Sequence, residues 1–221
     1  MPTNKSESDS ARLLPRALIH PEVTPDTPAR GFKHRSEGTV VVAQPSAYLN
    51  VQVDGRETSF FEWLGAGICC ADQRDTSQNG CRPHLLHQLH YGFDERFFYL
   101  RVDPFPGSLS PLRDFEFRIA LRGRDELRLL VAIEEGLLAG CLLDTEDLCI
   151  LGPHELVVVA FDRILEVALG RRLIEVKDQT FLALEVALWH AGILCDLLPR
   201  EISLEVQLGV DAFSWAIHDA G

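Results

Sequence analysis

Hydrophobic and polar residues along most of this chain alternate with a period of two, rather than the 3.6-residue period of a helix. In residues 115–119, apolar side chains alternate with charged ones, which is typical of a strand with one buried face. Short runs of this kind recur between turn residues, as at Asp54-Gly55. The predicted strands are residues 39–43, 47–53, 86–93, 96–103, 115–119, 127–133, 137–143, 156–161, 164–169, 181–189 and 202–208.

Many short strands at regular spacing predict an all-β protein, an antiparallel β-sandwich with jelly-roll or immunoglobulin-like layers. The helical alternative lies in residues 173–189, because Leu, Ala and Glu favour helices. A strand over 181–189 is preferred, because a helix there would be apolar on nearly every side. Residues 1–37 contain closely spaced prolines and are predicted to form an extended or loosely ordered arm before a sandwich domain of residues 38–221.

Residues 58–67 (TSFFEWLGAG) concentrate aromatic side chains, one carboxylate and two glycines. As an extended strand, this segment places Glu62 on one face between two apolar residues and Trp63 on the other. A carboxylate in that position lies at a sheet rim, or is buried with hydrogen-bond partners. A structural role and a functional role therefore both remain alternatives for Glu62.

Composition and charge narrow the class of partner. The formal net charge is −12, so the chain lacks the basic surface that nucleic acids and anionic membranes require. The six cysteines form no CxxC pair and are expected to be free thiols. No apolar run resembles a signal peptide or reaches membrane-spanning length, so we expect a cytoplasmic protein.

The sequence predicts no cofactor or metal. It has no Gly-x-Ser-x-Gly elbow and no glycine-rich phosphate loop. The histidines at 84, 87 and 90 invite a metal interpretation, but a spacing of three sends neighbours to opposite faces of a strand. The polar loop 72–80 carries oxygen ligands without the spacing of an EF-hand, and a solvated loop is the simpler interpretation.

Aromatic residues suggest a surface on which sugar rings stack, although large aromatic side chains more often belong to a core. The candidate carbohydrate-binding residues are Glu62, Trp63, Tyr91, Tyr99, Trp189 and Trp215. An enzymatic alternative pairs Glu62 with a second acid, such as Asp103 or Asp114, as the two carboxylates of a glycoside hydrolase. With 33 acidic residues in the chain, such pairs carry little information by themselves.

Several motifs occur together in order: VDG at 53–55, TSFFEWLGAG at 58–67, HYGFD at 90–94 and FYLRVD at 98–103. This series resembles the C-terminal region of glycoside hydrolase family 57 enzymes. The later half is similar, more loosely, to the β-sandwich of those enzymes and to family 9 carbohydrate-binding modules. The resemblance covers roughly residues 39–221 and includes the motif residues Asp54, Gly55, Gly65 and Gly67.

The resemblance implies a non-catalytic, carbohydrate-associated domain, because family 57 enzymes hold their catalytic Glu and Asp in an N-terminal barrel for which this chain has no room. Such a domain binds an α-glucan or docks on a separate family 57 catalytic chain. The alternatives are a minimal glycoside hydrolase acting on α-glucan and a structural remnant without a ligand.

Overall fold

The computed structural model describes residues 41–70, 84–123, 125–146, 148–152, 154–174, 181–200 and 203–207. The predicted arm of residues 1–37 and the candidate Trp215 lie outside these ranges. The described residues form 13 strands and one short 3-10 turn, η3 (Arg171–Leu173), with no α-helix among them. No helix in these ranges is long and apolar enough to cross a membrane.

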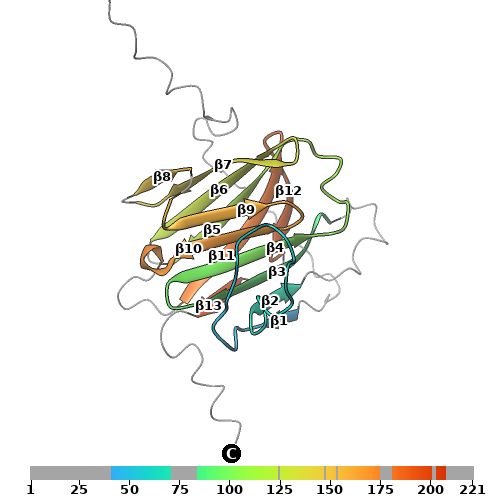
Figure 1. Ribbon diagram of the computed structural model, residues 1–221. Helices are drawn as coiled ribbons and strands as arrows, with labels where there is room; N and C mark the ends of the chain where they lie inside the picture. Colours follow the sequence, from blue (N-terminus) through green and yellow to red (C-terminus); the bar gives the residue numbers. More distant parts are fainter. Residues whose placement is uncertain are drawn as a thin grey trace, which may run out of the picture.

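The strands form two antiparallel sheets that pack face to face (Figure 1). The first sheet has the order β1-β2-β3-β4-β10-β9, and the second has the order β12-β11-β5-β6-β7-β8, with β13 pairing β11. The first contains β1 (Val41–Ala43), β2 (Gly67–Cys70), β3 (Leu86–Phe93), β4 (Phe97–Pro104), β9 (Val157–Phe161) and β10 (Leu165–Gly170). The second contains β5 (Phe115–Arg122), β6 (Glu126–Glu134), β7 (Leu137–Asp144), β8 (Cys149–Leu151), β11 (Phe181–His190), β12 (Ile193–Leu198) and β13 (Leu204–Gln207).

Alternate residues of both sheets build one hydrophobic core between them. On β5 the inward residues are Phe115, Phe117, Ile119 and Leu121, and all four are buried. The inward side chains of β4 and β10 meet them from the first sheet. The predicted all-β sandwich is therefore confirmed, and residues 181–189 form a strand as expected rather than a helix.

Two predictions about local structure are wrong. Residues 47–53 have no strand, and residues 60–65 form consecutive turns instead of an extended strand. In these turns Glu62 N–H donates to the Ser59 carbonyl and Leu64 N–H donates to the Phe61 carbonyl. The alternation of faces expected for 58–67 therefore does not apply.

Residues 44–66, which we call the cover segment, cross the outer face of the first sheet, as the blue-green trace in front of β4 and β10 shows (Figure 1). The Leu49 N–H donates to the carbonyl of Phe93 at the end of β3, and Gly55 packs against the β9–β10 turn. This segment explains why β10 is buried on both faces: the core covers one and the cover segment covers the other.

Candidate functional site

A buried carboxylate holds the cover segment in place. Glu166 on β10 is completely buried and accepts three hydrogen bonds: from Asp54 N–H at 3.0 Å, Gly55 N–H at 2.9 Å and Trp63 Nε1–H at 3.1 Å. Burial raises the pKa of the Glu166 carboxyl, although the three hydrogen bonds act in the opposite direction. The VDG and FFEWLGAG motifs thus converge on one side chain more than 100 residues later in the chain.

The motif glycines allow close approach of the backbone. Gly55 has φ +79°, and a Cβ there would lie 2.7 Å from the backbone nitrogen of Asp162. A Cβ on Gly67 would lie 2.6 Å from the ring of Tyr91. Gly55 therefore lets the cover segment lie directly on the β9–β10 turn, and Gly67, at the start of β2, leaves room for the Tyr91 ring.

Side chains of the cover segment and of the first sheet form a small second apolar cluster between them, separate from the main core. Its buried members are Leu49, Trp63, Ala66, Tyr99 and Ala168. The Tyr99 hydroxyl donates to a carboxylate oxygen of Asp94 at 2.7 Å. Burial, followed by this hydrogen bond, raises the pKa of Tyr99. These contacts make Trp63 and Tyr99 parts of the packing that holds the cover segment.

Polar side chains continue along the same outer face. The Arg101 guanidinium on β4 is bidentate to Asp103, with Nε 2.6 Å from Oδ1 and Nη2 2.9 Å from Oδ2. Burial alone would raise the pKa of Asp103, but hydrogen bonds from His90 and Arg101 outweigh it and hold this pKa below its ordinary value. Nδ1 of His90 is buried without a hydrogen-bond partner among the described residues. The cover segment reaches this group through Glu57, whose carboxylate lies 3.6 Å from Arg101.

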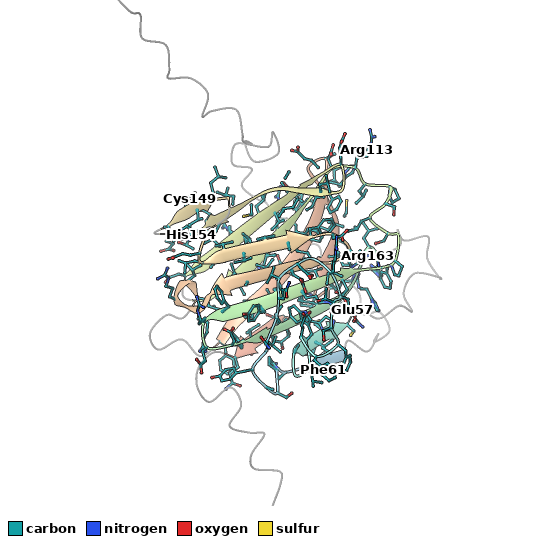
Figure 2. The ribbon with its side chains drawn as sticks, viewed as in Figure 1. Glu57, Phe61, Arg113, Cys149, His154 and Arg163 are labelled. Atoms are coloured by element: carbon teal, nitrogen blue, oxygen red, sulfur yellow. The ribbon has the colours of Figure 1, made fainter. Side chains whose placement is uncertain are left out.

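At the far end of the cover segment, three apolar side chains point away from the protein. We call Phe60, Phe61 and Leu64 the apolar tip; their exposed fractions are 75%, 75% and 55%. Figure 2 shows Phe61 at the periphery of the molecule, beside β1 and β2. The two phenyl rings meet edge to face, with centroids 5.9 Å apart and planes at 78°. Trp63, between Phe61 and Leu64 in sequence, is only 8% exposed and fixes the base of the tip.

The predicted carbohydrate platform is not assembled. Trp63, Tyr91 and Tyr99 are buried, so no broad ring face of these three residues is open for a sugar. Trp189 is half-buried on the outer face of the second sheet, with the Arg118 guanidinium carbon 4.0 Å from its ring centroid. The structure therefore separates Trp189 from the other aromatic candidates in the described ranges.

Among the described residues, Glu62 is not paired with either candidate acid, Asp103 or Asp114. Its carboxylate accepts a hydrogen bond from the Thr58 hydroxyl at 3.0 Å. Asp103 is bound to Arg101 on the sheet, and Asp114 accepts from the backbone N–H of Glu135 in the second sheet. Neither proposed partner acid therefore lies in a shared pocket with Glu62.

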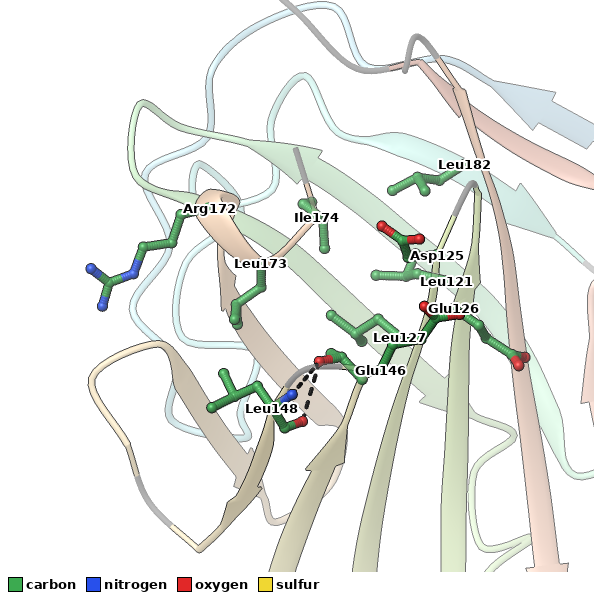
Figure 3. A pocket seen from close by; sticks show the side chains of 11 residues that line it. Leu121, Asp125, Glu126, Leu127, Glu146, Leu148, Arg172, Leu173, Ile174 and Leu182 are labelled. Atoms are coloured by element: carbon green, nitrogen blue, oxygen red, sulfur yellow. Dashed lines mark hydrogen bonds between the residues drawn. The ribbon is translucent and has the colours of Figure 1, made fainter. Parts of the chain in front are cut away.

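A pocket of about 200 Å³ opens at one end of the sandwich, between the β5–β6 turn, the β7–β8 turn and η3 (Figure 3). Its floor is apolar and includes Leu127, Ile174 and Leu182. Its acidic residues are Asp125, Glu126 and Glu146, but Glu126 is already paired with Arg122 and Arg128. None of the carbohydrate candidates within the described ranges lines this pocket.

The described ranges contain no group of three His, Cys, Asp or Glu residues arranged to hold a metal ion, and loop 72–80 lies outside them. Burial raises the pKa of the Cys69 thiol to about 11, so this thiol is not a reactive thiolate at neutral pH. Free cysteines in the described residues agree with the predicted absence of disulfides among them.

Sequence reasoning missed Glu166, the organising residue of the cover segment. Its signal is a charged residue inside the apolar run Leu165–Gly170. Comparison with known proteins does not place the chain in a family. It matches no protein-family model, and no curated protein or solved structure matches it significantly.

Proposed function

We propose that this protein is a non-catalytic, carbohydrate-associated β-sandwich, a stand-alone counterpart of the family 57 accessory region, that docks on a separate family 57 catalytic chain. The proposal rests on the sequence resemblance together with one structural observation. The resembling segment 58–67 divides into a buried base, which stabilises this chain, and the exposed apolar tip.

The tip has the chemistry of a protein-docking element. Two phenylalanines and a leucine exposed on consecutive turns form a protruding apolar surface, and aromatic side chains of this kind commonly anchor protein interfaces. The turns are fixed by backbone hydrogen bonds and by the buried Trp63, so little conformational freedom is lost on binding.

The tip suits a protein groove better than an α-glucan. A glucan chain stacks along roughly coplanar ring faces and needs polar groups for its hydroxyls, whereas the Phe60 and Phe61 planes differ by 78°. The polar side chains beside the tip already have partners: the Thr58 hydroxyl donates to Glu62, and the Ser59 hydroxyl accepts from the Phe61 N–H. Glucan binding at the tip is therefore the competing outcome of the experiment.

The test is isothermal titration calorimetry of the purified protein with a family 57 catalytic chain from the same genome. We expect the double variant Phe60→Ser/Phe61→Ser to weaken binding by about 100-fold or more, because interface aromatics carry much of the binding energy. Ile193→Ser, which removes an apolar residue 60% exposed on the β11–β12 hairpin, serves as the control and should bind normally.

Equal binding by the wild type and the double variant would reject the tip as the docking element, and absence of wild-type binding would reject docking on that chain. Electrophoresis in glycogen gels tests the competitor. Retardation of the wild type that is lost in the double variant would assign the tip to glucan instead. Circular dichroism and thermal unfolding verify that each variant is folded.

A further inference from the structure

The pocket at one end of the sandwich has an apolar interior. Six apolar side chains line it: Leu121, Leu127, Leu148, Leu173, Ile174 and Leu182. All but Leu148 and Leu173 are buried, with exposed fractions of 4% or less. A cavity of about 150 Å³ with leucine, isoleucine and phenylalanine walls stays dry and binds benzene. At about 200 Å³, this pocket has room for a small apolar group, and it is smaller than the usual site of a drug-sized molecule.

The rim of this pocket is acidic. Asp125 and Glu146 lie on it at exposed positions, and neither carboxylate forms a hydrogen bond or ion pair with another described residue. The Thr145 hydroxyl is already used inside the β7–β8 turn, where it donates to the Leu148 carbonyl and accepts from the Leu148 N–H. The Asp125 and Glu146 carboxylates therefore remain available to a ligand.

The arginines around the pocket are engaged with other acids and do not neutralise the rim. Arg172 is paired with Glu155 at 2.6 Å, and Figure 3 shows its guanidinium directed away from the other lining side chains. Arg122 and Arg128 are both paired with Glu126. Because the whole chain has a formal net charge of −12, the negative potential at the mouth is not offset by a basic surface elsewhere.

We infer that this pocket binds a small organic cation, an ammonium group carried on an apolar body of about six carbon atoms. The apolar body occupies the floor, and the ammonium group stays at the mouth, where Asp125 and Glu146 lie. The acidic rim selects a cation over an anion. The apolar floor selects an organic cation over a metal ion, because a hard metal ion needs oxygen ligands on several sides.

The test is an NMR titration of the isotope-labelled full chain with three probes that share a cyclohexyl ring. Cyclohexylammonium carries a positive charge, cyclohexanol is neutral and cyclohexanecarboxylate is negative. Cyclohexylammonium should shift the amide signals of Leu148, Leu173 and Ile174, which line the pocket. It should bind about three- to tenfold more tightly than cyclohexanol, because two exposed carboxylates each attract the ammonium modestly. Cyclohexanecarboxylate should bind most weakly of the three.

Two double variants separate the rim from the net charge of the chain. Asp125→Asn/Glu146→Gln removes both rim charges at exposed positions and leaves the apolar floor unchanged. This variant should lose the preference for cyclohexylammonium and should bind cyclohexanol as the wild type does. The control, Glu134→Gln/Glu135→Gln, removes the same charge at the β6–β7 turn, at the opposite end of β6 from the pocket, and should keep the preference.

Equal affinity of the wild type for the three probes would overturn the inference, and so would unshifted signals of the lining residues up to the solubility limit of cyclohexylammonium. A preference for the cation that is lost equally in both double variants would assign it to net charge rather than to the rim, and would also overturn the inference. The experiment contains neither a catalytic chain nor a glucan, so its outcome is independent of the proposed docking function.

Discussion

The outer faces of the two sheets handle charged residues in opposite ways. On the first sheet, Glu166 and Arg101 lie under or beside the cover segment and are almost completely buried. On the second sheet, Arg122 and Glu185 stay partly exposed and pair with each other across β5 and β11. The first face is covered by its own chain, whereas nothing in the described ranges covers the second.

This difference shows why similar residue types have unequal roles. A carboxylate removed from water requires fixed donors, and Glu166 therefore fixes the path of a distant segment. A carboxylate at the surface exchanges water for an arginine with little net gain. Buried charges such as Glu166 therefore help to fix the fold on the first face, whereas the paired charges of the second face stay partly exposed.

The largest expected effect comes from replacing the buried carboxylate. Glu166→Leu leaves the Asp54, Gly55 and Trp63 donors without their acceptor and should lower the free energy of unfolding by about 3 to 5 kcal/mol. Glu185→Leu on the other face should lower it by less than about 1 kcal/mol. Urea unfolding of the two variants measures both values. Equal losses would show that the cover segment is not held by Glu166.

A smaller effect is expected at a pair of glycines with the same backbone angle. Gly55 has φ +79° against the β9–β10 turn, and Gly136 has φ +78° in the β6–β7 turn, where no heavy atom of the described residues lies within 4 Å of an added Cβ. Gly136→Ala should destabilise by about 1 kcal/mol from backbone strain alone. Gly55→Ala should destabilise by about 3 kcal/mol, because its Cβ also meets the backbone of Asp162.

The same urea measurement checks this pair, and the difference between the two variants reports the close approach of the cover segment. If Gly55→Ala costs no more than Gly136→Ala, the segment moves away from the turn without penalty. The cover segment would then be packed only loosely on the first sheet, and the outer faces of the two sheets would differ less than the structure indicates.

The strands of the core were predictable because one inward face alternates with one outward face, as in β5 and β6. The cover segment was not, because Leu49 and Val51 are apolar for packing while their backbone forms no sheet ladder. Apolar pattern indicates burial, and it does not distinguish a strand from an irregular segment lying on a sheet. β12 was missed because Asp196 occupies an inward position, where its carboxylate accepts from the Leu85 and Leu86 N–H groups.

For the candidate site, the motifs mark the segment that lies on the first sheet, but they do not indicate which of its side chains are exposed. Trp63 and Tyr99 are aromatic, as a sugar platform requires, but they are buried between the cover segment and the first sheet. Tyr99 pairs with Ala168 of β10 and Trp63 donates a hydrogen bond to Glu166 of β10, so the burial of both depends on a strand more than 60 residues away, and no local pattern reports such contacts. Phe60 and Phe61, which were not carbohydrate candidates, are the rings that the turns expose.

The smallest expected change in the free energy of unfolding comes from pH, because protonation of a carboxylate removes no side chain and leaves the packing in place. Two buried carboxylates should respond with opposite signs. Burial raises the pKa of Glu166, so the folded protein holds this proton more tightly than the unfolded chain. Burial also acts to raise the pKa of Asp196, but hydrogen bonds from Arg200 and the Leu86 N–H outweigh it and lower this pKa.

We therefore expect the stability of the wild type relative to Glu166→Gln to fall as pH rises above about 4.5, the ordinary pKa of this group. Relative to Asp196→Asn, wild-type stability should be constant above about 3.8 and should fall as pH decreases through the lowered pKa of Asp196. Urea unfolding from pH 3 to 7 gives both differences, in which the other titrating groups cancel. The two stability differences should change with pH in opposite directions. Folding raises the pKa of Glu166 because it is buried, and it lowers the pKa of Asp196 because Arg200 binds the carboxylate. A change in the same direction would contradict one of these two pKa shifts.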